Sequence, residues 1–195
     1  KEFVTDIGRE AERLSRITEN LLRLTRLDGG VVPSAYPVAV GPVLQRVERM
    51  LGVVAGEKGV AISGSASEDA VALATEDDVH QILYNLMENA IKYSAAENGF
   101  VRAEASVQDG QVVIHVADTG RGIPQEFWQS IFQPFFRVDK SLSRELGGAG
   151  LGLPLVWEIA RLHGGRVWVE ESTDSGSVLA VTFPLSAPTT DAGRE

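Results

Sequence analysis

The sequence contains no cysteine, so it can form neither a disulfide framework nor a thiolate metal site. Its three histidines, His80, His115 and His163, lack the short spacings of a structural zinc site. No apolar run approaches the roughly 20 residues of a bilayer-spanning helix, and the N-terminus does not resemble a signal peptide. These absences predict a globular chain without a structural zinc ion and without a membrane segment.

An excess of positive charge is also missing, because the formal net charge is -9. This value argues against general binding to nucleic acid or to an anionic membrane, although an acidic protein can still contain one cationic site. With 195 residues, of which 44% are hydrophobic, the chain is long enough for one well-buried core and an appendage.

The appendage is a predicted helix over residues 5–27. Its apolar positions form a heptad-like seam that one helix cannot bury alone, at Ile7, Leu14, Ile17, Leu21 and Leu24. Asp28, Gly29 and Gly30 end the helix. We expect half of an antiparallel helical hairpin that pairs with another chain, and the alternative is a helix folded back on its own domain.

The rest of the chain predicts one mixed helix-and-strand domain over residues 31–186, followed by a disordered tail at 187–195. Helices are expected over 41–56, 76–93 and 155–163, with a short helix within 124–136. Strands are expected over 60–63, 71–74, 100–108, 111–117, 166–170 and 178–185. Asp109-Gly110 predicts a hairpin turn, and Thr75 with Asp78 resembles a capping box.

The helix over 76–93 carries the residues around which the chain is organised. At about 100° per residue, Asn85, Asn89 and Lys92 project within roughly 60° of one another, beside the apolar stripe. An Asn oxygen can bind a hard cation, its nitrogen can donate to phosphate, and Lys adds positive charge. This pattern indicates a nucleotide site, and the alternative is a solvated polar edge of a core helix.

Two glycine-containing segments add to this hypothesis. Asp118-Thr119-Gly120-Arg121-Gly122-Ile123 follows a strand, where a carboxylate can accept a hydrogen bond from the amine of adenine; a ligand-free Asx turn is equally compatible. Residues 137–148 predict a mobile loop that ends in glycines before a helix start, whose free N–H groups suit phosphate. Neither a P-loop nor a dinucleotide-binding fingerprint is present. The phenylalanines around Pro134 favour a packed corner over a binding element.

Together these motifs closely resemble the catalytic ATP-binding domain of bacterial sensor histidine kinases. They occur in the order Asn85-x-x-x-Asn89-Ala90-x-Lys92-Tyr93, Asp118-x-Gly120-x-Gly122-Ile123, Phe132-x-Pro134-Phe135 and Gly148-x-Gly150-x-Gly152-Leu153. The resemblance covers about residues 36–186, and residues 1–30 resemble the second helix of the family's dimerisation and phosphotransfer hairpin. It implies an α/β (α+β) fold, namely the two-layer sandwich shared with gyrase, MutL-type and heat-shock chaperone ATPases, with helices on one face of a mixed sheet.

The resemblance also implies ATP and Mg²⁺ as ligands. By this similarity Asn89 would hold Mg²⁺, Asn85 would contact the metal or the phosphates, Lys92 would offset phosphate charge, Tyr93 would line the site and Asp118 would accept the adenine amine. The other expected ATP-binding residues are Gly120, Gly122, Ile123, Gly148, Gly150, Leu151 and Gly152, with Arg137, Lys140 and Arg144 in the ATP lid. Any of these three cations could reach the terminal phosphates.

One departure from the family is large, because no His-Glu/Asp-x-Arg-x-Pro type motif occurs. None of the three histidines suits the role of phosphoacceptor, so we expect a fragment that binds ATP and transfers its γ-phosphoryl group to a histidine outside this sequence. The expected partners are ATP or ADP, a response regulator, and a second copy bound through the helical hairpin. The expected location is the cytoplasm, either free or as the cytoplasmic part of a membrane-anchored sensor.

Three other functions are compatible with the same fold. A clamp-type ATPase is expected, from those relatives, to have a water-activating glutamate where Asn85 stands, and Asn cannot take a proton. A serine-directed anti-sigma kinase would share the ATP site but not the N-terminal heptad helix. A degenerate, non-catalytic dimerisation module would not be stabilised by MgATP.

Overall fold

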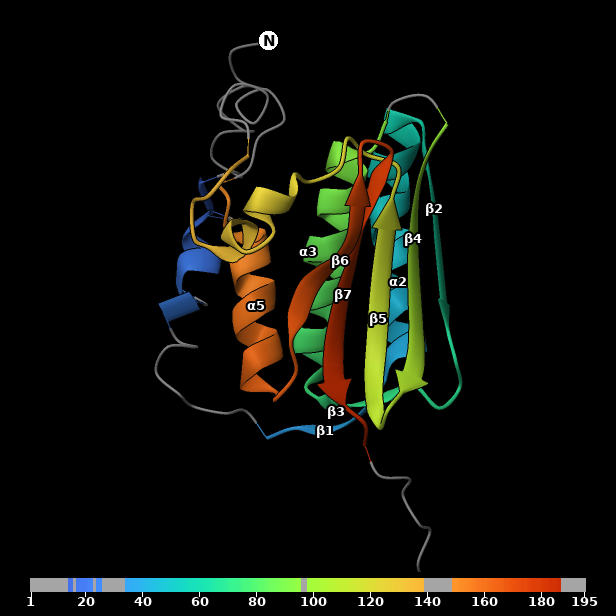
Figure 1. The fold of residues 1–195 in the computed structure, drawn as a ribbon. Helices are drawn as coiled ribbons and strands as arrows, with labels where there is room; N and C mark the ends of the chain where they lie inside the picture. Colours follow the sequence, from blue (N-terminus) through green and yellow to red (C-terminus); the bar gives the residue numbers. More distant parts are fainter. Residues whose placement is uncertain are drawn as a thin grey trace, which may run out of the picture.

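The computed structural model describes residues 14–15, 17–22, 24–25, 34–95, 98–138 and 149–186. Three α-helices lie side by side over one face of a five-stranded sheet (Figure 1). They are α2 (Val40–Lys58), α3 (Glu76–Tyr93) and α5 (Gly152–Leu162), with α3 in contact with both of the others. The predicted two-layer α/β sandwich is therefore confirmed.

The sheet is mixed and has the strand order β2-β4-β5-β7-β6. Its strands are β2 (Val60–Ala66), β4 (Gly99–Gln108), β5 (Gln111–Asp118), β6 (Val167–Thr173) and β7 (Gly176–Pro184). Strands β2 and β4 are parallel, with α3 in the connection between them, and the other neighbours are antiparallel. A separate two-stranded sheet pairs β1 (Tyr36–Ala39) with β3 (Val71–Ala74).

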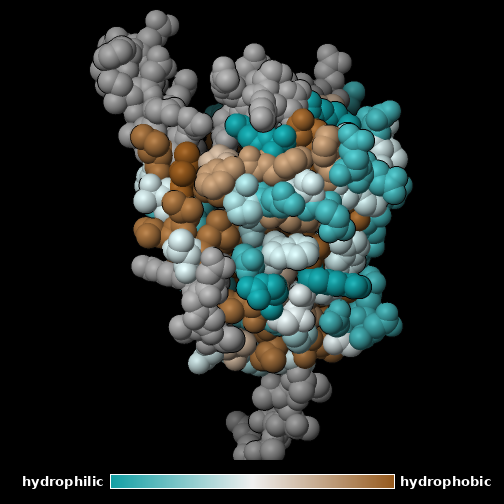
Figure 2. Space-filling model, turned by 60° about the vertical axis from the view of Figure 1, so that its left-hand side comes forward, coloured by the Kyte–Doolittle hydropathy of each residue, from teal (hydrophilic) through white to brown (hydrophobic). Residues whose placement is uncertain are grey.

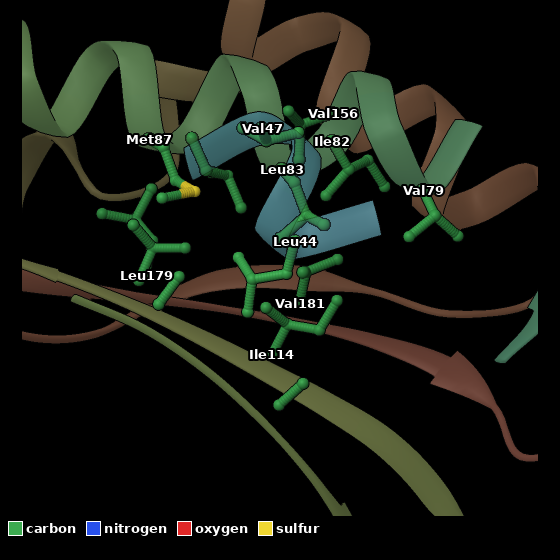
Figure 3. Packing of buried hydrophobic residues seen from close by; sticks show 14 of the residues in the cluster. Leu44, Val47, Val79, Ile82, Leu83, Met87, Ile114, Val156, Leu179 and Val181 are labelled. Carbon is green, nitrogen blue, oxygen red and sulfur yellow. The ribbon is translucent and has the colours of Figure 1, made fainter. Parts of the chain in front are cut away.

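The core lies between the helices and the sheet, and α3 forms its centre. Val79, Ile82, Leu83 and Met87 follow helical spacing, so they share the face of α3 that points toward β5 and β7 (Figure 3). All four are fully buried. Because this apolar face is fixed against the sheet, the polar flank of α3 has a fixed direction too.

Most of the predicted elements are present with similar boundaries. The helix expected at 76–93 is α3 itself, and Thr75 caps it by accepting a hydrogen bond from the Asp78 N–H at 3.2 Å. The predicted hairpin joins β4 and β5 through Asp109 and Gly110, whose φ angles are 48° and 74°. The last predicted helix begins earlier than expected, at Gly152.

The short helix expected within 124–136 is present only as 3₁₀ structure, and no α-helix forms there. This segment forms two 3₁₀ turns, η1 (Gln125–Phe127) and η2 (Ser130–Phe132). Gln133, which precedes Pro134, is extended (φ -81°, ψ 139°), so the helical backbone ends at Phe132.

The described residues between 14 and 25 are helical, as predicted. Leu24 is half-buried against the core, whereas Leu14 is 57% exposed and Leu21 is 44% exposed. Apolar side chains gather on the face of the molecule to which this helix and α5 contribute (Figure 2). The helix therefore contacts its own domain at Leu24, and pairing of the remaining seam with another chain stays a prediction.

Two other predictions fall wholly or mainly outside the described residues, namely the tail at 187–195 and the loop at 137–148, of which only Arg137 and Val138 are described. Within the described residues, no helix combines the length and the apolar character needed to cross a bilayer.

Candidate nucleotide-binding site

Asn85 points from α3 toward the first turn of α5. It is 6% exposed, and its Nδ2 donates to the Gln81 carbonyl at 2.9 Å, one turn earlier in the same helix. This bond fixes the rotamer of the amide, so that Oδ1 faces the neighbouring helix. A buried amide oxygen held in this way is a pre-oriented acceptor or cation ligand.

Gly152 allows α5 to approach both asparagines. A Cβ atom built at this residue would lie 3.0 Å from Asn85 Oδ1 and 3.7 Å from Asn89 Nδ2. The asparagines and the glycine-led start of α5, far apart in the sequence, therefore meet. The unpaired N–H groups of a helix start favour anions, and they lie here beside two carboxamides.

Asp118 ends β5, and its carboxylate is partly sheltered from solvent. Its Oδ1 accepts a hydrogen bond from the Gly120 N–H at 2.7 Å, which is the Asx turn that the sequence allowed. Burial raises the pKa of Asp118, and backbone hydrogen bonds from Gly120 and Ser177 lower it by less. An acceptor of this kind favours a partner that donates hydrogen bonds.

The loop after Asp118 packs against the end of α3. Gly120 forms a β-bridge with Ser94, and a Cβ atom at Gly120 would lie only 2.6 Å from the Tyr93 carbonyl oxygen. Gly122, at φ 72°, has equally little space, since a Cβ atom would lie 1.9 Å from the Thr173 carbonyl oxygen. Both glycines are therefore required by the close approach of other backbone segments of the same chain.

Positive charge gathers at the C-terminal end of α3. The Tyr93 ring has Lys92 Nζ 5.3 Å from its centroid and the Arg121 guanidinium carbon 6.0 Å from it. Lys58 Nζ donates to the Ile91 carbonyl at 2.7 Å and also to the Lys92 carbonyl, and burial lowers the pKa of Lys58. These cations complement the negative end of the helix dipole.

The phenylalanine segment joins this region to α5. Phe132 is buried against Trp157, with ring centroids 5.5 Å apart, and Phe136 packs on Phe127 at 5.7 Å. These two residues fit the expected packed corner. Phe135 does not, because it is 61% exposed and has a φ of 65°, and its N–H donates to the Gly150 carbonyl at 3.0 Å.

The residues expected at an ATP site are thus partly brought together. The structure gathers two groups along α3: Asn85 and Asn89 with Gly152, and Tyr93 with the Asp118 loop. Leu151, directly before α5, is buried. The Ile123 N–H donates a hydrogen bond to Ser172 Oγ at 2.7 Å. Arg137 is half-buried. The other expected residues lie outside the described part of the chain, namely Lys140, Arg144 and Gly148.

Sequence reasoning missed one buried polar pair, which lies at the other end of the contact between α3 and α5. His163 Nε2 lies 2.8 Å from Asp78 Oδ2, and both side chains are excluded from solvent. The sequence pattern indicated a capping box for Asp78 and no partner for His163. A contact between residues so far apart in the sequence leaves no periodic signal that could have identified it.

This fold and this gathering of carboxamides, a glycine-flanked carboxylate and a glycine-led helix start define a nucleotide-binding α/β sandwich of the ATPase type. The chain belongs to the family described as "Histidine kinase-, DNA gyrase B-, and HSP90-like ATPase", whose profile matches residues 74–187. The resemblance to sensor histidine kinases is confirmed by individual relatives. Sensor protein CutS of Streptomyces coelicolor is 32% identical over 174 residues, which are 89% of this chain and 42% of CutS.

Solved structures give the same result. Full-length ShkA in complex with AMPPNP has a TM-score of 0.82 and 31% identity, over 95% of this chain and 39% of ShkA. Histidine kinase ThkA in complex with response regulator protein TrrA has a TM-score of 0.73 and 23% identity, over 95% of this chain and 51% of ThkA, and supports the fold alone. The chain spans less than half the length of the first curated relatives that it matches, 36% and 42%.

Proposed function

We propose that this chain binds MgATP and serves as the kinase domain of a two-component sensor histidine kinase. The observation that carries the proposal is the position of α3, whose middle meets the glycine-led start of α5 and whose end meets the Asp118 loop. One extended ligand could contact both places. Its phosphate end would lie at the asparagines and its purine end at the carboxylate.

At the purine end, Asp118 would accept a hydrogen bond from the exocyclic amine of adenine. The bond from the Gly120 N–H fixes the carboxylate, and partial burial strengthens any further hydrogen bond it accepts. Gly120, Gly122 and Ile123 would hold the loop close to the base, and Tyr93 would line the site. ADP would be bound by the same groups.

At the phosphate end, the first turn of α5 would offer backbone N–H groups from the Gly150-Leu151-Gly152 segment, as helix starts do for anions. Lys92 would add positive charge from α3. Arg137, with Lys140, Arg144 and Gly148 of the lid, would complete the surroundings of the terminal phosphates.

Asn85 and Asn89 suit Mg²⁺, because the Gln81 bond leaves the Asn85 oxygen as the atom directed at the phosphate end. Mg²⁺ takes few protein ligands and completes its octahedron with phosphates and water. When bound, it supplies neutralisation of the charge on the β- and γ-phosphates. The chain itself would contribute positioning and exclusion of water.

Transfer to another protein group is favoured over hydrolysis. Asn85 cannot act as a base, and it stands where clamp-type ATPases are expected to have glutamate. Of the histidines present, His163 is buried with Asp78, His115 lies 3.1 Å from Glu170, and His80 stacks on Tyr84. The phosphoacceptor would therefore be a histidine outside this sequence. A response regulator would receive the phosphoryl group from that histidine. The kinase would form a homodimer through the N-terminal helix.

Two linked measurements test this proposal. Calorimetry should find one MgATP site per chain, and γ-labelled ATP should transfer its label to a protein in which this chain is joined to a helical segment that carries a phosphoacceptor histidine. Sustained release of inorganic phosphate without labelled protein would identify a hydrolase instead. Absence of MgATP binding would identify a non-catalytic module.

A further inference from the structure

Helices α3 and α5 pack against each other in opposite directions and meet at two places. At one place the start of α5, Gly152, lies against Asn85 and Asn89. At the other, His163, which ends α5, bonds Asp78 in the first turn of α3. The second place is remote from every residue that the proposed function uses.

The backbone turn after α5 fixes His163 in this position. Gly164 has a φ of 73°, and the Gly165 N–H donates to the Ala160 carbonyl at 2.8 Å. Gly165 lies directly on β7, since a Cβ atom there would be 1.8 Å from the Thr182 carbonyl oxygen. The chain must turn sharply onto the sheet, and the His163 side chain is left pointing into the core.

Burying the His163–Asp78 pair between two helices costs desolvation free energy. The His163 side chain is 0% exposed and that of Asp78 is 7% exposed, and the His163 ring lies 6.0 Å from that of fully buried Phe183. Its Nδ1 is buried and has no hydrogen-bond partner among the described residues. Apolar side chains of similar volume usually stabilise such a place as well or better, so stability alone does not account for the pair.

A directional bond does something that apolar packing does not, because it fixes how two helices slide and tilt. Residue 163 lies roughly 16 Å along α5 from Gly152, at 1.5 Å per residue. A small tilt about the His163 end is therefore largest at the asparagines. Sites of this kind depend on geometry held to within about 0.5 Å.

We propose that His163 and Asp78 are positioning residues, whose buried bond sets α5 against α3 so that the start of α5 keeps its spacing from Asn85 and Asn89. The inference rests on the proposed MgATP site. Asp78 precedes Asn85 by about two helical turns, roughly 10 Å, so the pair acts on the nucleotide through helix position and not by contact.

The test compares His163→Phe, which removes the bond and fills the space, with His163→Gln, whose amide nitrogen can still donate to Asp78. Leu44→Val is the control for a loss of stability without a change at the α3–α5 contact. Leu44 is buried over Gly64 of β2, which is the edge strand at the other end of the sheet from β6. Calorimetry measures the Kd of MgATP and of adenosine under conditions where each variant is folded by circular dichroism.

His163→Phe should weaken MgATP binding roughly three- to tenfold while leaving adenosine binding near the wild-type value, because only the phosphate end depends on α5. His163→Gln and Leu44→Val should bind both ligands as the wild type does. If His163→Phe does not fold, Asp78→Leu, which removes the acceptor and keeps a similar volume, should show the same selective loss.

Equal MgATP affinity in the folded His163→Phe or Asp78→Leu variant, or a loss shared by adenosine, would overturn the positioning role and leave the proposed function intact. A wild-type chain that binds adenosine but gains no affinity from the phosphates of MgATP would overturn both.

Discussion

Gly152 in the first turn of α5 lies directly against Asn85 of α3, so that a Cβ atom at residue 152 would be 3.0 Å from Asn85 Oδ1. That separation is tighter than ordinary van der Waals contact, and the Asn85 amide is held in place by its bond to Gln81. Because Gly152 has no side chain, the start of α5 can pack closely against Asn85 and Asn89 of α3.

The first prediction is that Gly152→Ala weakens MgATP binding several-fold without unfolding the protein. The methyl group must push Asn85 Oδ1 away by a few tenths of an ångström, and a site for Mg²⁺ and phosphate tolerates little displacement. Calorimetric titration with MgATP measures the effect.

Gly52→Ala is the matched control, because Gly52 is also helical, in α2, and a Cβ atom there meets nothing within 4 Å. It should raise the free energy of unfolding by about 0.5–1 kcal/mol and leave binding unchanged. Unchanged affinity in Gly152→Ala would show that the contact with Asn85 has no role in binding.

The second prediction concerns Asp118→Asn, which should weaken ATP binding about tenfold by removing a charge-assisted hydrogen bond. In the wild type, affinity should also fall as acid protonates Asp118. Since burial raises its pKa, that loss should begin at a higher pH than the usual Asp value of 3.8 would give. Inosine triphosphate has a carbonyl in place of the amine, so its affinities for the wild type and for Asp118→Asn should differ far less than those of ATP.

The same substitution should stabilise the ligand-free protein at neutral pH. A carboxyl whose folded pKa is raised contributes stability that is present below its unfolded pKa and lost as the pH rises through the folded pKa. Asn avoids that loss and can still accept the Gly120 bond. Urea unfolding should therefore favour Asp118→Asn at neutral pH, with the advantage vanishing near pH 3.8; an advantage that persists there would have another cause.

Sequence periodicity was sufficient for the elements that hold the site. The apolar spacing of Val79, Ile82 and Leu83 predicted α3, and Asp109-Gly110 predicted the β4–β5 turn, because both signals are local. The glycines at 120 and 152 could be assigned to motifs, but not to the neighbours that make them necessary. Those neighbours, Tyr93 and Asn85, come from a different part of the chain.

What the sequence could not supply was long-range pairing of polar groups. His163 with Asp78 and Lys58 with the end of α3 depend on how helices cross, which the apolar pattern of each helix does not encode. The segment around Trp128 forms 3₁₀ turns where a short helix was expected, because the local pattern of apolar residues does not distinguish the two.

The third prediction is that Lys58→Met lowers the free energy of unfolding by about 1–2 kcal/mol. Lys58 donates to two carbonyls at the end of α3, at Ile91 and Lys92, and Met keeps the apolar stem without the donor. Glu57→Gln, at the exposed neighbouring position, should have no comparable effect in the same urea titration. Equal stability of the two variants would mean that water replaces the Lys58 bonds at no cost.

The fourth prediction separates two phenylalanines of one motif. Phe135→Gly should leave stability unchanged or raise it by up to about 1 kcal/mol, because Gly accepts a φ of 65° without strain and the ring is 61% exposed. Phe132→Ala should cost about 3–5 kcal/mol, because that ring is buried against Trp157. A large loss in Phe135→Gly would show that its ring is packed in solution.

The most direct measurement of the central claim follows backbone amide resonances while MgATP is added to the isotope-labelled protein. If one nucleotide lies along α3, the amides of Asn89, Gly120 and Gly152 should all shift and reach saturation at the same MgATP concentration. Shifts confined to one of these segments, or different midpoints for the Asp118 loop and the start of α5, would contradict a single shared site.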